Sequence, residues 1–138
     1  MFSNTDSSGV YSMTSERRAA AEAAAVGEHL RLLQATIPPQ ASKDQALTKL
    51  GVDLGFPVWY GANFDALFDC LSDPEWCPAK GHVILINGMA ELRASDLGGF
   101  TMLIEVFQAA AEARREAGSP FWILLDSPAR GIAAFPQA

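Results

Sequence analysis

Residues 56–76 read FPVWYGANFDALFDCLSDPEW and contain a short helix with two unlike faces. Asn63 can cap this helix, which we predict over residues 64–72, and Pro74 follows its end. At 100° per residue, one side is apolar and should face a core: Phe64, Leu67 and Leu71. The helix therefore predicts a hydrophobic layer beneath it and leaves an acidic face outward.

Apolar runs on both sides of this helix predict the strands of one sheet. They cover residues 10–13, 30–37, 83–86 and 121–125. Helical spacing predicts further helices over residues 15–26 and 42–54, and a long one from Ser95 or Asp96 to about residue 117. Strands that alternate with helices indicate the α/β class, with a small, mostly parallel sheet of three or four strands packed against helices.

The chain length of 138 residues suits a single domain. We place this domain at residues 10–125. Residues 1–9 are polar and predict a flexible N-terminal tail, and residues 126–138, rich in Pro, Gly and Ala, predict a loosely packed C-terminal tail. The sequence does not decide whether the first predicted strand and helix join the sheet.

The overall charge of the chain favours some kinds of binding partner over others. The net charge of −6 disfavours direct binding to nucleic acid and favours a basic protein as partner.

We find no signal peptide and no apolar run of membrane-spanning length, so we expect a cytoplasmic protein that does not enter membranes. The two cysteines, Cys70 and Cys77, lack the spacing of a metal or redox site, and we expect no metal and no cofactor.

Acidic charge is concentrated in one part of the chain. Residues 50–79 contain no Lys or Arg, and their five acids supply five of the six net negative charges: Asp53, Asp65, Asp69, Asp73 and Glu75. The same residues hold six of the thirteen aromatic side chains: Phe56, Trp59, Tyr60, Phe64, Phe68 and Trp76. Aromatic anchors beside acidic charge are typical of a binding hot spot for a basic partner.

Three acids share one face of the predicted helix at an i, i+4, i+8 spacing: Asp65, Asp69 and Asp73. Phe68 falls at the border of this face. Like charges four residues apart destabilise an isolated helix by roughly 0.2–0.5 kcal/mol per pair, so folding does not favour the arrangement. An ordinary solvated face is the alternative, but the absence of cations and the adjacent Trp59 and Tyr60 favour a binding surface.

Residues 56–73, FPVWYGANFDALFDCLSD, resemble the barstar family of intracellular ribonuclease inhibitors without a gap. The positions that carry the resemblance are Pro57, Tyr60, Gly61, Asn63, Asp65, Ala66, Leu67, Asp69, Cys70 and Leu71. The later elements follow in the family's order, so the similarity covers roughly residues 30–125. It implies a barstar-like fold and a non-enzymatic inhibitor, monomeric when free, that blocks the active site of a basic ribonuclease.

The resemblance also implies roles for single residues. Asp69 would enter the nuclease active site and replace substrate phosphate among cationic side chains, and Asp65 would add contacts at its rim. The other expected partner-binding residues are Trp59, Tyr60, Gly61, Asn63, Phe68, Asp73 and Trp76. Trp59, Tyr60 and Gly61 would form the loop that lies over the enzyme.

The chain departs from the family pattern at contact positions. Ala109 stands where the family has a glutamate that contacts the enzyme, and Glu105 and Glu112 flank it on the same helix face as possible replacements. Ala62 stands where the family has an acid before the helix, and residues 73–75 reshape the loop after it. These changes leave the identity of the cognate nuclease open.

Two other classes of function remain. The chain could be a small α/β enzyme, but His29 and His82 have no visible nucleophile partner, and common catalytic motifs are missing. The stronger alternative is a non-enzymatic acidic binding module, an immunity or regulatory protein, whose partner is a DNase, another basic toxin or another basic protein.

Overall fold

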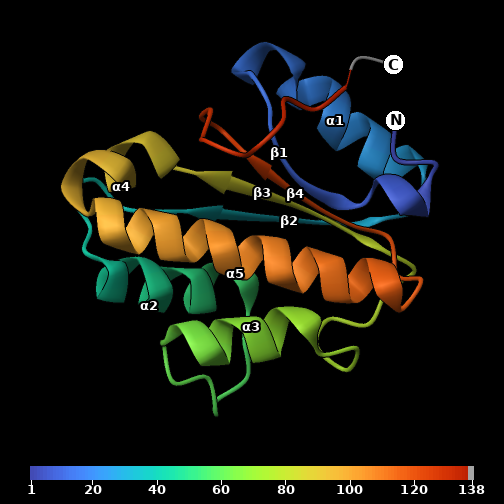
Figure 1. Ribbon diagram of the computed structural model, residues 1–138. Coiled ribbons are helices and arrows are strands. Elements are labelled where there is room, and N and C mark those ends of the chain that lie inside the picture. The colour runs from blue at the N-terminus through green and yellow to red at the C-terminus, as the bar shows by residue number, and fades with distance from the viewer. Residues whose placement is uncertain (137–138) are drawn as a thin grey trace.

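A four-stranded parallel sheet forms the centre of the protein (Figure 1). The computed structural model describes residues 1–136. The strands are β1 (Gly9–Ser12), β2 (Arg31–Thr36), β3 (His82–Asn87) and β4 (Phe121–Leu125), in the spatial order β1-β4-β3-β2. All neighbouring strands are parallel, and the two central strands, β3 and β4, are almost wholly buried. This arrangement confirms the predicted α/β class.

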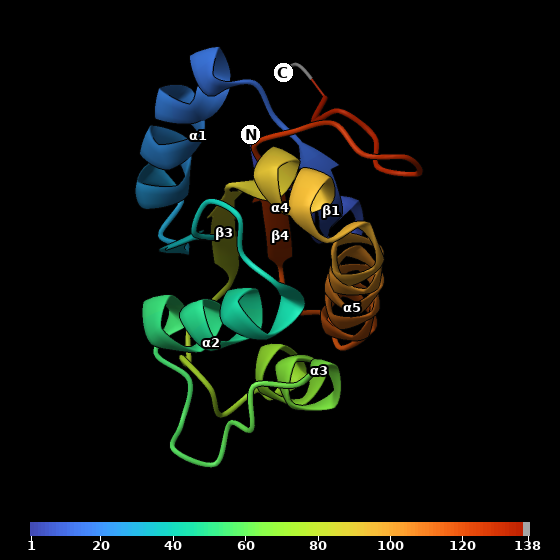
Figure 2. The same cartoon turned by 90° about the vertical axis from the view of Figure 1, so that its left-hand side faces the viewer.

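Helices cover both faces of the sheet. The helices are α1 (Ser15–Gly27), α2 (Lys43–Leu54), α3 (Phe64–Ser72), α4 (Met89–Ser95) and α5 (Leu97–Glu116), and a short 3-10 helix covers Thr5–Ser7. One hydrophobic cluster lies between α1 and the sheet, and a larger one joins the opposite face to α2, α3, α4 and α5. Figure 2 shows α1 and α5 on opposite sides of the strands. Among residues 1–136, no helix is both long and apolar enough to cross a bilayer.

Local signals explain where the helices begin. Ser42 and Gln45 form a capping box at α2, and Gly55 ends that helix in the left-handed conformation. Asp96 caps α5 through the N–H of Gly99 and also accepts a 2.9 Å bond from the N–H of Lys43. Asp96 therefore ties the start of α5 to the start of α2.

The N-terminal residues differ from the expected flexible tail. Phe2 is only 4 % exposed and packs on Trp122, whose indole N–H donates to the carbonyl of Ser7. The Ser8 hydroxyl accepts from the N–H of Phe121 at 3.0 Å. The composition of residues 1–9 is mostly polar, but Phe2 is buried on the sheet and Met1 is partly buried beside it. The first predicted strand joins the sheet, because β1 pairs with β4.

The C-terminal residues pack more closely than predicted. Phe135 is 5 % exposed and lies against Phe2 and Tyr11, and its N–H donates to the carbonyl of Ser12. Residues 137–138 of the predicted tail lie outside the described residues.

The helix α4 was not predicted. It has seven residues, which is too short a segment for helical spacing of apolar residues to be recognised.

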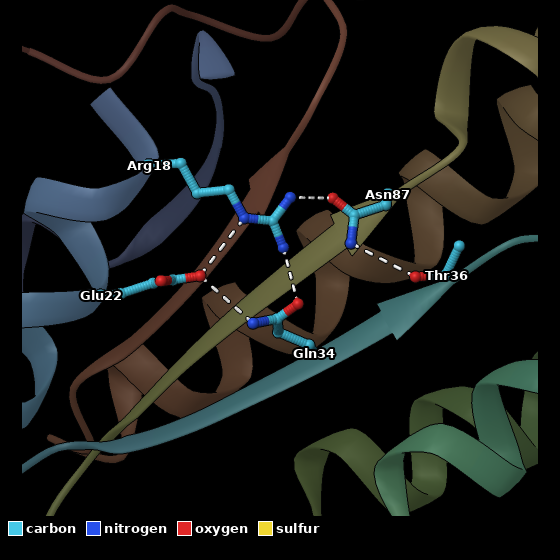
Figure 3. A network of polar contacts seen from close by, with 5 residues as sticks. All are labelled: Arg18, Glu22, Gln34, Thr36 and Asn87. Carbon is cyan, nitrogen blue, oxygen red and sulfur yellow. Dashed lines mark hydrogen bonds and ion pairs between the residues drawn. The ribbon is translucent and has the colours of Figure 1, made fainter. Parts of the chain in front are cut away.

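A polar network fixes α1 to the sheet (Figure 3). Arg18 of α1 donates to Glu22 on its own helix, to Gln34 of β2 and to Asn87 of β3. Asn87 in turn donates to the Thr36 hydroxyl. The network joins three elements that are far apart in sequence, and it holds α1 over the carboxyl ends of β2 and β3.

Candidate functional site

The helix α3 forms as the sequence predicts. The Asn63 side chain accepts from the N–H of Ala66 at 2.7 Å, and Asp65 lies in the first turn, where a carboxylate suits the helix dipole. Asp73 is the C-cap residue and Pro74 follows it. The strong cap at one end and the proline at the other restrict the helix to two and a half turns.

The two faces of α3 are separated as predicted. Leu67, Cys70 and Leu71 are buried against the rest of the core, while Asp65 and Asp69 are exposed. Phe64 and Phe68 are partly buried between the two faces. Asp69 and Asp65 thus point away from the core on the same side of the helix.

A shallow hollow of about 540 Å³ lies between α3 and α5. Its acidic members are Asp65 and Asp69 from α3 and Glu105 from α5, and its other lining residues are Phe64, Phe68, Met102, Val106 and Ala109. The floor is therefore apolar and three carboxylates surround it. We call this feature the α3–α5 hollow.

The carboxylates of the hollow are available to a partner. Within the described residues, Asp65, Asp69 and Glu105 take part in none of the ion pairs or side-chain hydrogen bonds. Glu112 differs from Glu105 because it pairs with Arg115 on the same helix. Of the two acids proposed to flank Ala109, only Glu105 lies in the hollow.

Not every acid of residues 50–79 belongs to this surface. Asp53 pairs with Lys49 at 2.6 Å and accepts from the N–H of Thr36. Burial opposes ionisation of Asp53, but these hydrogen bonds outweigh it and lower the pKa of the carboxyl. Asp73 is half-buried and accepts from the N–H of Glu75, so it stabilises the loop after α3.

The loop before α3 directs its two adjacent aromatic side chains oppositely. Trp59 is 54 % exposed, and the neighbouring Val58 is fully exposed. Tyr60 turns inward, where its ring packs on Phe56 and its hydroxyl donates to the carbonyl of Leu47 at 2.7 Å. Burial raises the pKa of Tyr60 above its ordinary value. Tyr60 thus anchors the loop, while Trp59 and Gly61 are exposed to solvent.

Trp76 does not lie on the predicted surface. It is only 7 % exposed, it packs on Phe56, and it stacks on the ring of His82 with the centroids 5.9 Å apart. The predicted contact of Trp76 with a partner is therefore wrong, because the ring fills the core behind the loop that follows α3.

Arg114 holds the end of α3, and His82 holds the loop that follows it. Arg114 is buried, donates to the carbonyls of Leu71 and Asp73 at 2.8 and 2.9 Å, and lies over the ring of Phe121. His82 bonds the carbonyl of Cys77 at 2.6 Å. Arg114 thus caps the C-terminal end of the acidic helix.

Sequence reasoning missed Arg114, Val58 and Met102. Arg114 has one signal, its position seven residues after Phe107 on the apolar stripe of α5. Val58 and Met102 look like ordinary core residues in sequence, and only their exposure identifies them.

The Cys70 thiol beneath the acidic face of α3 is not activated. Burial raises the pKa of the Cys70 thiol to about 11, and Asp69 and Asp73 add to the effect. The thiol is therefore protonated at neutral pH and is a poor nucleophile. Within residues 1–136, no three His, Cys, Asp or Glu side chains gather in a way that could hold a metal ion.

Comparison with known protein families identifies a family for this chain. A family model described as Barstar (barnase inhibitor) matches residues 30–126. No curated protein sequence matches the chain. The family match includes β2, β3, β4 and the helices of the α3–α5 hollow, whereas β1 and α1 precede it.

Proposed function

The chain belongs to the barstar (barnase inhibitor) family, and on that premise we propose that it binds a basic ribonuclease and blocks its active site. The surface that makes the contact is the acidic face of α3, the α3–α5 hollow and the loop that carries Trp59. Members of this family act as inhibitors, so the proposed activity is binding and not catalysis.

The unpaired carboxylates around the α3–α5 hollow carry the proposal. Asp65, Asp69 and Glu105 converge from two helices, and within residues 1–136 no cationic side chain pairs with them. A ribonuclease active site concentrates Arg, Lys and His to bind phosphate, so its electrostatic potential is complementary to this surface. We propose that Asp69 takes the place of the substrate phosphate and that Asp65 binds near the rim.

The third carboxylate fills a gap in the family pattern. Ala109 leaves the hollow without the family's glutamate, and Glu105 lies on the same helix one turn earlier. Glu112 is already paired with Arg115. We therefore propose that Glu105, and not Glu112, supplies the acid from α5.

Apolar side chains complete the surface. Trp59 and Val58 are exposed beside the acidic helix, and Met102 is 44 % exposed in the hollow. Aromatic and apolar groups around a charged centre exclude water and strengthen the contacts they enclose. Gly61, Asn63 and Phe68 remain in the proposed contact set, while Asp73 shapes the loop after α3.

We further propose that the protein acts as a monomer in the cytoplasm. Cys70 and Cys77 are both free thiols, which agrees with a reducing compartment.

The second candidate function is neutralisation of a DNase or another basic toxin. It is favoured by the two alanines, Ala62 and Ala109, that stand at family contact positions.

A panel of basic secreted ribonucleases, barnase among them, tests the proposal. The purified chain should inhibit at least one of them, and Asp69→Ala should weaken inhibition about ten-fold to 100-fold, since a charge-assisted hydrogen bond is lost. Glu91→Ala, an exposed acid on α4, is the matched control and should leave inhibition unchanged. Inhibition of no ribonuclease, with inhibition of a basic DNase, would favour the second candidate. Inhibition that Asp69→Ala leaves intact would refute the proposed site.

A further inference from the structure

The crossovers of the sheet run in two opposite directions. The chain passes from β1 at one edge to β2 at the other through α1, and then steps back to β3 and β4 through helices on the opposite face. At the carboxyl ends of the strands, the chain therefore leaves β1 and β3 towards different faces. In open α/β sheets, ligands bind in the crevice at such a switch point.

A cavity of about 190 Å³ lies at this place. Thr14 and Ser15, which follow β1, Asn87, which ends β3, and Asp126, which follows β4, contribute polar groups to its wall. Leu85 and Leu124 are among the apolar residues that line it. An apolar floor with a few convergent polar groups is the usual composition of a small-molecule site.

Arg18 brings a positive charge to the cavity. Arg18 is one of the lining residues, and Figure 3 shows its side chain extended from α1 towards the end of β3. A guanidinium has five N–H donors. Three contacts hold it in place, to Glu22, Gln34 and Asn87, so further N–H groups are free for a ligand.

The other polar groups of the wall also favour a ligand that accepts hydrogen bonds. Within the described residues, the hydroxyls of Thr14 and Ser15 have no hydrogen-bond partner. Asp126 is already engaged, because its two carboxylate oxygens accept from the N–H groups of Gly88 and Met89 at 2.9 and 3.2 Å. The free polar groups are therefore the remaining N–H groups of Arg18, which only donate, and two hydroxyls, which can donate to a carboxylate.

We propose that this cavity binds a small monocarboxylate with an apolar body. The carboxylate accepts from Arg18 and from the Thr14 and Ser15 hydroxyls, and the body lies on Leu85 and Leu124. The cavity, at about 190 Å³, is smaller than the roughly 300–1,000 Å³ of drug-sized sites, which limits the ligand to a molecule smaller than a drug. The acids Glu22 and Asp126 disfavour a doubly charged anion such as phosphate.

This site is separate from the α3–α5 hollow. It lies towards α1, while α3 and α5 pack on the opposite face of the sheet. Four of its ten lining residues precede residue 30, where the family match begins: Met13, Thr14, Ser15 and Arg18. The site therefore depends on the part of the chain that the family model does not cover.

NMR titration of the ¹⁵N-labelled full chain tests the site. The probes are isovalerate, hexanoate and phenylacetate, each compared with its neutral amide. We expect saturable shifts at the backbone amides of Ser15, Leu124 and Asp126 with at least one acid, and no saturation with the amides. Arg18→Gln should weaken binding of the acid about ten-fold, as the loss of a charge-assisted hydrogen bond does.

The controls separate loss of binding from loss of folding. Circular dichroism checks that Arg18→Gln is folded, and the double variant Thr14→Val/Ser15→Ala removes only the two hydroxyl donors and should also weaken binding. Arg31→Gln, at an exposed arginine outside the cavity, should bind as the native chain does. Absence of saturation up to about 10 mM acid, equal binding of acid and amide, or native affinity in the double variant would overturn the proposal.

Discussion

The ring of Tyr60 lies so close to Gly51 that a Cβ on Gly51 would stand 2.6 Å from two of its carbon atoms. The hydroxyl of the same residue bonds the carbonyl of Leu47, one turn earlier in α2. Glycine inside a helix costs about 1 kcal/mol relative to alanine. The helix α2 thus gives up intrinsic stability to seat the ring that anchors the Trp59 loop.

We expect Gly51→Ala to destabilise the protein by about 1–3 kcal/mol, because the new methyl group overpacks the Tyr60 ring. Helix propensity alone predicts the opposite sign. Gly98→Ala in α5 is the matched control, since its nearest neighbour would be the Asp96 carboxylate at 3.9 Å. Gly98→Ala should be neutral or stabilise by up to about 1 kcal/mol. Urea unfolding measures both variants, and equal stability of the two would contradict the packing argument.

Arg114 provides a second test of how α3 is held. Arg114→Met keeps the aliphatic stem but leaves the carbonyls of Leu71 and Asp73 without their donor. We expect a loss of about 2–4 kcal/mol in the free energy of unfolding, since two buried acceptors lose their bonds. Hydrogen exchange should increase most in α3 and the loop after it. Arg115→Met, whose guanidinium pairs with Glu112 on the surface, should cost less than about 1 kcal/mol.

Much of the fold follows from local patterns in the sequence. The central strands are continuous apolar runs, and Ser42, Asn63 and Asp96 predict the helix starts that the structure shows. The helix α4 was missed because it is short, and because the carboxylate that bonds its first N–H groups comes from Asp126, far away in the sequence. A partner distant in sequence leaves no local signal.

The candidate site was predicted only in part, because some of its contacts join residues that are far apart in the sequence. The helical period placed Asp65 and Asp69 outward correctly, but it could not separate Glu105 from Glu112, which lie on the same face. The structure distinguishes them, because Glu105 lies in the α3–α5 hollow and Glu112 pairs with Arg115. The burial of Trp76 depends on its stacking with His82, a contact between a loop and a strand that sequence spacing does not show.

His82 should make the stability of the protein depend on pH. Its Nε2 donates to the carbonyl of Cys77, which leaves the buried Nδ1 without a partner in the described residues. Burial lowers the pKa of His82 from 6.5, and Arg114 and Arg31 contribute in the same direction against the Cys77 bond. The folded state therefore holds His82 neutral, while the unfolded state takes up a proton below about pH 6.5.

The free energy of unfolding should be constant above pH 7 and fall below pH 6.5, by up to about 1.4 kcal/mol per pH unit for one proton. His82→Gln keeps an N–H donor for Cys77 but does not titrate, so its stability should change less between pH 7 and pH 5. Urea unfolding of both proteins across this range measures the difference. Parallel curves for the two would show that another group causes the pH dependence.

Asp69 and Asp65 should differ in their effect on the free protein, although both are proposed to bind the partner. Asp69 lies four residues after Asp65 and four before Asp73, so Asp69→Asn relieves repulsion at two spacings and should stabilise the free chain by roughly 0.3–1 kcal/mol. Asp65→Asn relieves one repulsion but loses a favourable charge in the first turn of α3, and should leave stability nearly unchanged. Thermal unfolding at low salt measures both variants, and high salt should reduce the gain for Asp69→Asn because it screens exposed charges.

A stabilised Asp69→Asn that no longer inhibits a ribonuclease would show that the carboxylate is retained for binding at the expense of stability. A destabilised one would show that Asp69 has a structural partner in solution, and the claim that it is free to meet a cation would then fail.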